Sequence, residues 1–129
     1  MSDNVEISTK VIGSLAKKID DINQANGFNE EDSTDPYIVG LQVDRRLFLA
    51  VGELIEAQEE LRSGRGITEV YYSKDKNGKD KLEGFGPEVA DAIIRLLHLC
   101  YRYDIPIGEL INEKLAYNAT RGYKHGRKF

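Results

Sequence analysis

The chain has 129 residues, 40% hydrophobic and 31% charged, and its formal net charge at pH 7 is −4. These values fit one soluble domain with its own hydrophobic core and exclude the disordered class. The negative charge argues against a protein that holds nucleic acid polymers through their phosphates. No apolar run reaches the roughly 18 to 20 residues of a membrane span, so no membrane partner is expected. The first residues lack a signal-peptide pattern, which predicts a cytoplasmic protein, or host cytoplasm for a viral one.

The first half of the chain predicts two helices. Over residues 5–25 apolar side chains recur every three or four positions, as on one face of an amphipathic helix, and Gly27 suits the turn that ends it. Asp35 is a good N-cap and Pro36 a good first helical residue. The second helix is therefore expected over about residues 37–62.

The second half predicts two more helices and one polar excursion. A helix over residues 87–103 opens near Pro87, and another covers about 106–118. The excursion before them contains Asn77-Gly78, a dipeptide typical of type I′ turns, so a short hairpin and a mobile loop are both open. The fold class expected for residues 1–129 is a single all-α domain of four helices.

The third predicted helix is apolar on most of its circumference, with one narrow polar stripe. At about 100° per residue the stripe is about 80° wide. A helix that is apolar on most sides is usually buried, so the stripe is either a thin exposed edge or the lining of a polar cleft. Its members are Glu88, Asp91, Arg95, His98 and Arg102.

The second predicted helix repeats the acidic spacing. Glu53 and Glu56 lie three positions apart, as do Glu88 and Asp91, and like charges at this spacing repel. Two facing helices with such pairs would gather four carboxylates, which a hard divalent cation such as Mg²⁺ neutralises through oxygen ligands. A solvated acidic face is the alternative that spacing alone leaves open.

The acidic stretches resemble a known family. "LFLAVGELIEAQEELRSG", followed by "EVADAIIRLL", is similar to the MazG-type all-α nucleoside triphosphate pyrophosphohydrolases, whose motif is Glu-x-x-Glu on one helix and Glu-x-x-Asp on the next. The tail "INEKLAYNATRGYKHGRKF" looks like that of short, phage-like members. Two departures are Gly52, where many members carry an additional acid, and the long separation between the two motifs.

The resemblance implies magnesium-dependent hydrolysis of a nucleoside triphosphate to the monophosphate and pyrophosphate, with Mn²⁺ as an alternative ion. Glu53, Glu56, Glu88 and Asp91 would be the metal ligands, and Glu56 is our choice for the group that orients or deprotonates the attacking water. Deoxynucleotides are favoured by the phage-like tail, with dGTP as one candidate. A non-catalytic helical interaction or regulatory module that keeps the bundle is the alternative.

The basic tail supplies candidate phosphate ligands. Lysine offers a point charge and arginine a fork for phosphate oxygens, although a frayed basic terminus is the plain alternative. The apolar circumference of the third helix also predicts that a homodimer or homotetramer completes the bundle. The candidate substrate-binding residues are Lys114, Asn118, Arg121 and Tyr123.

Overall fold

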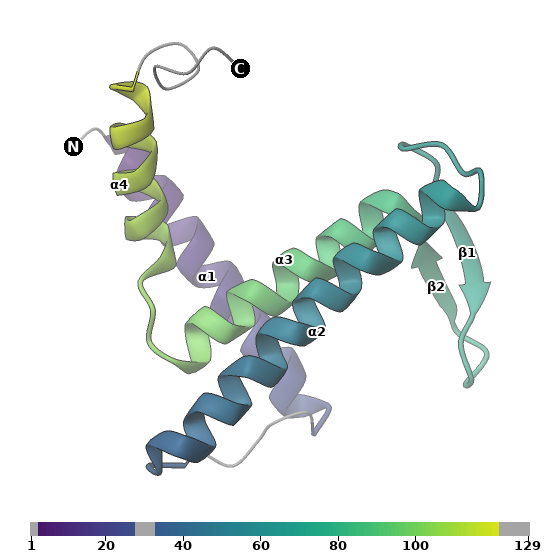
Figure 1. The fold of residues 1–129 in the computed structure, drawn as a ribbon, viewed down its shortest axis with the longest axis horizontal. Helices are drawn as coiled ribbons and strands as arrows, with labels where there is room; N and C mark the ends of the chain where they lie inside the picture. Colours follow the sequence, from purple (N-terminus) through teal and green to yellow (C-terminus); the bar gives the residue numbers. More distant parts are fainter. Residues whose placement is uncertain (1–2, 28–32, 122–129) are drawn as a thin grey trace. The chain divides into compact units, whose positions relative to one another are not determined.

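The computed structural model describes the backbone of residues 3–27 and 33–121, and side chains from residue 9 onward within these ranges. The described chain is mainly helical, as the all-α prediction requires, with one small sheet (Figure 1). Within these ranges no helix has both the length and the apolar character that crossing a membrane demands. The elements in chain order are α1 (Asp3–Ala25), α2 (Pro36–Arg62), β1 (Tyr71–Lys74), β2 (Asp80–Glu83), α3 (Phe85–Arg102) and α4 (Ile107–Ala119).

The end of α1 and both ends of α2 lie where the local sequence predicts them, whereas α3 begins at Phe85, before the predicted residue 87. The Asp35 carboxylate accepts a hydrogen bond from the backbone N–H of Tyr37 at 2.9 Å, and Pro36 is the first residue of α2. This N-cap satisfies a donor that has no partner inside the helix. Gly27 follows α1 with a φ of 76°, and Gly64 follows α2 with a φ of 89°. Both take the left-handed conformation in which glycine ends helices.

The chain divides into two compact units. The α1–α4 unit contains α1, α4 and the chain from Cys100 onward. In it α1 and α4 approach closely, because a side chain at Gly108 would lie 3.0 Å from the Cα of Thr9. Asn112 also donates to the Thr9 hydroxyl at 2.7 Å. Buried Asp20 lies 3.9 Å from the Arg102 guanidinium, an ion pair that the sequence pattern did not reveal.

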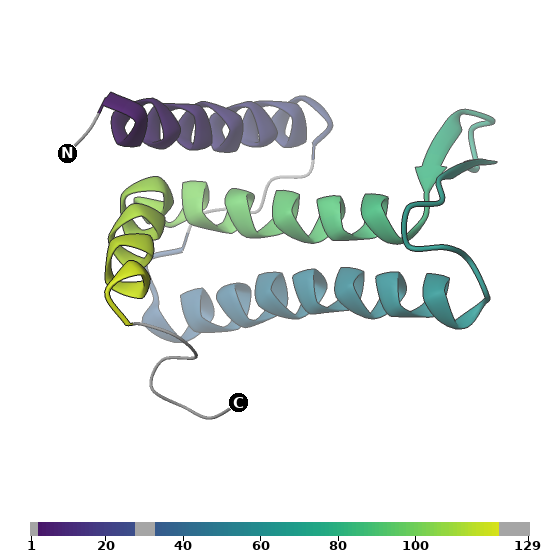
Figure 2. The same ribbon diagram turned by 90° about the horizontal axis from the view of Figure 1, so that it is seen from above.

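The α2–α3 unit contains α2, the hairpin and α3 as far as Leu99. Here α2 and α3 run side by side in both ribbon views, and the hairpin lies at the end where α2 finishes and α3 begins (Figures 1 and 2). The buried positions of α2 are Ala50 and Ala57, small residues that allow a neighbouring helix to come close. Arg46 on α2 is also hydrogen-bonded to buried His98 on α3, at 3.3 Å.

The excursion forms a hairpin rather than an irregular loop. β1 and β2 pair antiparallel, with Tyr71 opposite Glu83 and Lys74 opposite Asp80. The turn is not the type I′ turn predicted from Asn77-Gly78, because Gly78 has a φ of 79° whereas Asn77 does not have a positive φ. The Asp75 carboxylate accepts hydrogen bonds from the backbone N–H groups of Asn77 and Lys79, at 2.8 and 2.9 Å. This side-chain bonding favours a turn in which glycine alone is left-handed.

Two contacts attach the hairpin to the end of α2. The Tyr71 hydroxyl donates to the Glu60 carboxylate at 2.8 Å. The Arg65 guanidinium stacks 3.7 Å from the centre of the Tyr71 ring and pairs with Glu60 at 3.2 Å. Gly84 then joins β2 to α3 with a φ of 135°, where a Cβ would lie 2.4 Å from the Glu69 carbonyl oxygen. The hairpin is therefore attached to the end of α2 at Tyr71, and it leads into α3 through a closely packed Gly84.

Candidate metal centre

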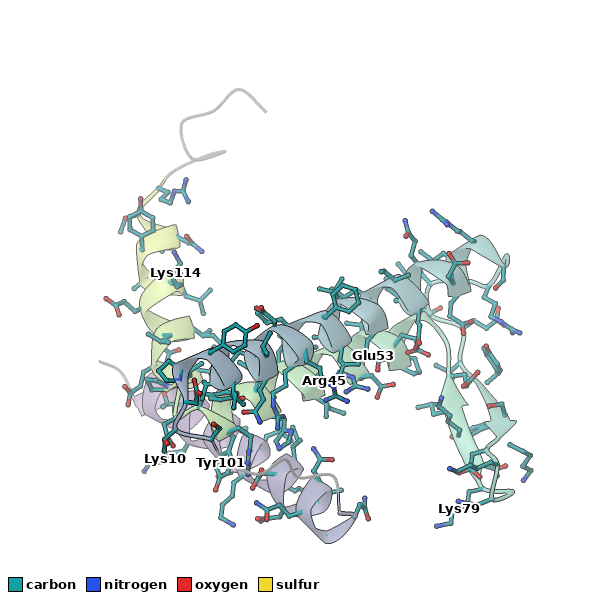
Figure 3. All side chains as sticks on the ribbon, turned by 60° about the horizontal axis from the view of Figure 1, so that its bottom comes forward. Lys10, Arg45, Glu53, Lys79, Tyr101 and Lys114 are labelled. Atoms are coloured by element: carbon teal, nitrogen blue, oxygen red, sulfur yellow. The ribbon has the colours of Figure 1, made fainter. Side chains whose placement is uncertain are left out.

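Three of the four predicted metal ligands lie together in the α2–α3 unit. Glu53 and Glu56 share a face of α2 because they are three positions apart, and Glu88 lies in the first turn of α3. Carboxylate oxygens of these three residues all lie within 4.8 Å of one another. Figure 3 shows Glu53 on α2, with Lys79 at the far tip of the hairpin. We call Glu53, Glu56 and Glu88 the acidic cluster.

Glu88 is the buried member of the acidic cluster. Its exposed fraction is 7%, and its Oε2 atom is buried without a hydrogen-bond partner. Leaving a carboxylate in this state is costly, because a buried charge needs either a counter-charge or a proton. Glu88 therefore needs a counter-charge or a proton. An exposed acid in the first turn of a helix would need neither, because water solvates its charge.

The pKa values of Glu88 and Glu53 shift in opposite directions within the acidic cluster. Burial, followed by the neighbouring Glu53 and Glu56 carboxylates, raises the pKa of Glu88 to about 8. For Glu53, burial opposes ionisation, but hydrogen bonds from Arg95 and Glu88 outweigh it, so the pKa of Glu53 is lowered. Near neutral pH the metal-free cluster thus holds a proton on Glu88 beside an ionised Glu53. This is the state expected of a cation site without its cation.

Asp91, the fourth predicted ligand, lies next to the acidic cluster but outside the close set of three. It is half-buried on α3, one turn after Glu88. Burial raises the pKa of Asp91, and the negative charge of Glu53 raises it further. The Glu53 charge therefore reaches Asp91 across the two helices. The role of Asp91 as a fourth ligand stays a prediction.

Arg95 belongs to the same site, although the sequence pattern suggested no role for it. Its Nε–H donates to Oε1 of Glu53 at 2.8 Å, across the two helices. The signal was present in the sequence, since Arg95 follows Asp91 by four positions within the polar stripe. Its partner was not predictable, because Glu53 is 42 positions away along the chain.

The polar stripe of α3 is covered in part, although Arg95 within it is exposed. Glu88 and His98 within it are buried, whereas Ile93 on the apolar side is 51% exposed. At Glu88 and His98 burial therefore favours a covered polar lining over a thin exposed edge. Ile94 and Leu96 are exposed as well, so the apolar side of this helix is only partly covered within the chain.

The hairpin brings a cation toward the site. Lys81 on β2 pairs with Glu83 at 3.4 Å. This pairing raises the pKa of Lys81, and the charges of Glu88 and Asp91 raise it further. Glu60, by contrast, is engaged with Tyr71 and Arg65 and takes no part in the acidic cluster. The acids of α2 therefore divide between a structural and a candidate functional set.

The predicted phosphate ligands lie in the α1–α4 unit. Lys114, Asn118 and Arg121 are exposed, and the charged groups of Lys114 and Arg121 lie 5.9 and 5.4 Å from the centre of the Tyr117 ring. Tyr123 lies outside the described residues. The role of these residues toward the acidic cluster stays a prediction.

The arrangement fits a hard divalent cation. Oxygen donors alone form the cluster, one of them is buried and lacks a partner, and Glu56 is exposed, so solvent reaches the site.

No protein-family model matches the chain, and comparisons with curated proteins and with solved structures find no match.

Proposed function

We propose that the chain is a magnesium-dependent nucleoside triphosphate pyrophosphohydrolase that releases a nucleoside monophosphate and pyrophosphate. The observation that carries the metal site is the buried, unpartnered Oε2 of Glu88 beside Glu53 and Glu56. The choice of substrate rests on the resemblance of the two acidic motifs and the basic tail to the MazG-type family. Deoxynucleotides, with dGTP as one candidate, are the favoured substrates.

In this proposal Glu53, Glu56 and Glu88 hold the ion, and Asp91 completes the set. A bound Mg²⁺ would supply neutralisation of the triphosphate charge as the bond to pyrophosphate breaks. Glu56 is the exposed member of the acidic cluster and so the one that solvent reaches. It is therefore our candidate to orient a water molecule, and accept its proton, for attack at the α-phosphorus with pyrophosphate leaving.

The basic residues are proposed to bind the substrate. Lys114 and Arg121 would contact phosphate oxygens, and Asn118 a phosphate or the sugar. Tyr123 is kept in this set as a prediction. The spacing of Lys114 and Asn118 on one face of α4 supports their joint use, because residues four positions apart are neighbours on a helix.

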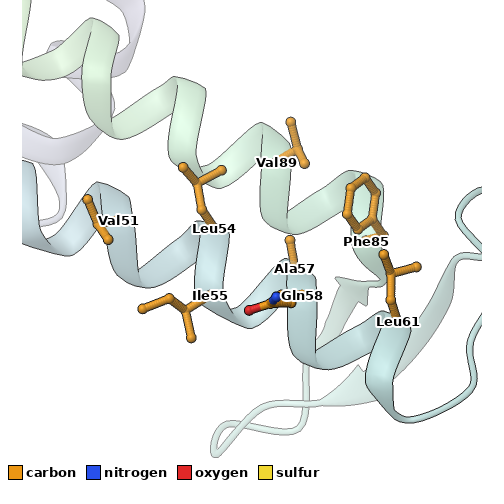
Figure 4. A pocket seen from close by; sticks show the side chains of 8 residues that line it. All are labelled: Val51, Leu54, Ile55, Ala57, Gln58, Leu61, Phe85 and Val89. Carbon is orange, nitrogen blue, oxygen red and sulfur yellow. The ribbon is translucent and has the colours of Figure 1, made fainter.

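We propose further that a second copy of this chain covers the apolar side of the α2–α3 unit. Phe48 is 77% exposed, and Leu54 and Ile55 are also exposed. An apolar groove runs along the two helices (Figure 4), and a second helix pair would convert them into a four-helix bundle. Its lining residues are Val51, Leu54, Ile55, Ala57, Gln58, Leu61, Phe85 and Val89.

Light scattering tests the self-association. The wild-type protein at micromolar concentration should be a dimer or tetramer, and Leu54→Glu should shift it toward monomer. Tyr72→Glu, at an exposed aromatic residue outside the groove, is the control that should leave the mass unchanged. A monomeric wild-type protein would contradict the proposal.

The enzyme proposal is tested by incubating the protein with each nucleoside and deoxynucleoside triphosphate and Mg²⁺, and measuring pyrophosphate. Turnover should depend on Mg²⁺ and be lost in Glu88→Gln. Glu59→Gln is the matched control, since Glu59 is an exposed acid on the same helix as Glu53, paired with Arg62. Orthophosphate as the product would instead indicate a phosphatase. Absence of both turnover and magnesium-dependent nucleotide binding would favour the non-catalytic helical module.

A further inference from the structure

Arg95 is a cation in direct contact with the acidic cluster, and the contact is made by its Nε–H group. The Nε–H donates to Glu53 at 2.8 Å. A guanidinium has five N–H donors, so the four on the two Nη atoms lie outside this bond. The Arg95 side chain is 42% exposed, whereas that of Glu53 is 13% exposed. The positive group thus lies where the covered acids meet solvent.

Three other arginines of the α2–α3 unit, Arg46, Arg62 and Arg65, have different engagements. Arg46 is bonded to His98, Arg62 pairs with Glu59, and Arg65 stacks on Tyr71. Arg95 therefore differs from them in having a proposed metal ligand as its partner. Its positive charge favours the ionised form of both Glu53 and Asp91; the pKa of Glu53 is lowered, whereas burial keeps the pKa of Asp91 raised.

A guanidinium stays charged at every physiological pH, so it cannot leave the site by losing a proton. It pairs with Glu53 in the metal-free protein through Oε1, one of the two carboxylate oxygens that Glu53 could offer a divalent cation. A cation ligated by Glu53 weakens this ion pair, because the two positive charges compete for one carboxylate. The released fork then needs a new anion, and phosphate oxygens match its geometry.

We propose that Arg95 is a substrate-binding residue that rests on Glu53 in the metal-free protein and contacts a phosphate of the nucleoside triphosphate when metal and substrate bind. This inference rests on the proposed function. Arg95 would then weaken the binding of the metal ion alone and strengthen the binding of the anionic substrate.

The experiment compares wild type, Arg95→Met and Arg95→Lys in two binding titrations. The first measures Mn²⁺ binding without nucleotide, by electron paramagnetic resonance or calorimetry. The second measures binding of a non-hydrolysable deoxynucleoside triphosphate analogue at saturating Mg²⁺. Arg62→Met is the matched control, because it removes an arginine that pairs with an exposed acid of α2 outside the acidic cluster.

Arg95→Met should bind free Mn²⁺ several-fold more tightly than wild type and the triphosphate analogue about 10- to 100-fold more weakly, the loss expected for a charged hydrogen bond. Arg95→Lys should recover part of the triphosphate affinity, since it keeps the charge but not the fork. Arg62→Met should leave both affinities unchanged. Circular dichroism of each variant verifies the helical content.

Three outcomes would overturn the inference. If Arg95→Met leaves triphosphate binding unchanged while wild type binds Mn²⁺ and hydrolyses substrate, the role of Arg95 fails and the proposed function stands. If both affinities weaken together, Arg95 is structural. If wild type binds neither Mn²⁺ nor the analogue, the inference and the proposed function fail together.

Discussion

Glu53 and Glu88 lie on neighbouring helices with carboxylate oxygens within 4.8 Å, yet their pKa values move in opposite directions. Glu53 has the Arg95 guanidinium as a donor, whereas the Glu88 Oε2 is buried with no partner. Two nearby carboxylates in different surroundings share their proton unequally. The metal-free site therefore stores one proton at neutral pH, and this has two measurable consequences.

Metal binding should release that proton. The pKa of Glu88 is about 8, so at pH 7 a cation must displace a proton before Glu88 can be a ligand. Affinity for Mg²⁺ should rise with pH up to about 8 and then level off. Calorimetry at pH 7 in buffers of different ionisation enthalpy should show release approaching one proton per site in wild type and in Glu59→Gln. Metal binding without proton release would contradict the assignment of Glu88.

The stability of the metal-free protein should fall as pH rises from about 4.5 to about 8. Across this window native Glu88 keeps a proton that the unfolded chain has lost, because its native pKa is raised from 4.5 to about 8. Unfolding then releases a proton, and this group contributes a slope of about −1.4 kcal/mol per pH unit to the free energy of unfolding.

Urea unfolding in the presence of a chelator measures this slope. Glu88→Gln, which is neutral at every pH, should show a flatter profile than wild type. At pH 8 it should be more stable by on the order of a few kcal/mol. Parallel profiles for the two proteins would mean that Glu88 is ionised in the native state.

Asp91→Asn should lose turnover while keeping the fold. The amide has nearly the same shape, and removing a carboxylate whose pKa is raised by burial relieves repulsion with Glu53. Activity should fall at least about 10- to 100-fold, the loss typical even of outer-shell metal partners. Initial rates of pyrophosphate release and the thermal midpoint without metal are the measurements. Normal turnover would remove Asp91 from the ligand set.

Arg121→Ala should act mainly on substrate binding. Arg121 is exposed, and its guanidinium lies 5.4 Å from the centre of the Tyr117 ring. The loss of a charged contact to phosphate predicts a KM raised about 10-fold or more with a smaller change in kcat. An unchanged KM would remove Arg121 from the substrate-binding set.

Gly84→Ala should destabilise the start of α3. Alanine disfavours a φ of 135°, and its Cβ would lie 2.4 Å from the Glu69 carbonyl oxygen. The expected cost is about 2 kcal/mol or more. Gly86→Ala is the matched control, since a Cβ there meets nothing within 4 Å and the residue is helical. Urea unfolding of the two variants should differ clearly, and equal stabilities would mean that the backbone at Gly84 relaxes freely.

The sequence predicted best those features that depend on neighbouring residues. The Asp35-Pro36 cap and the left-handed Gly27 are set by local backbone chemistry, and both are confirmed. The spacing of Glu53 and Glu56 likewise predicted a shared helix face.

Features that depend on distant partners escaped prediction. The pairing of Arg95 with Glu53 joins two helices, and periodicity within either helix does not carry that information. The turn at Asn77-Gly78 was predicted incorrectly because the dipeptide alone omits the Asp75 carboxylate. Burial of Glu88 and exposure of Ile93 depend on which side of α3 has a neighbour, and a helical wheel does not establish this.

The hairpin allows the chain between α2 and α3 to change in length without changing the geometry of the acidic cluster. One end is held at Tyr71 by Glu60, the other passes close to the Glu69 carbonyl at Gly84, and the tip at Lys76 and Asn77 is exposed. Residues added at the tip would lengthen the path between the acids of α2 and α3 without moving either helix. The tip is therefore a natural insertion point for a reporter peptide or affinity tag, and evolution could vary the length of this segment while keeping the carboxylates in register.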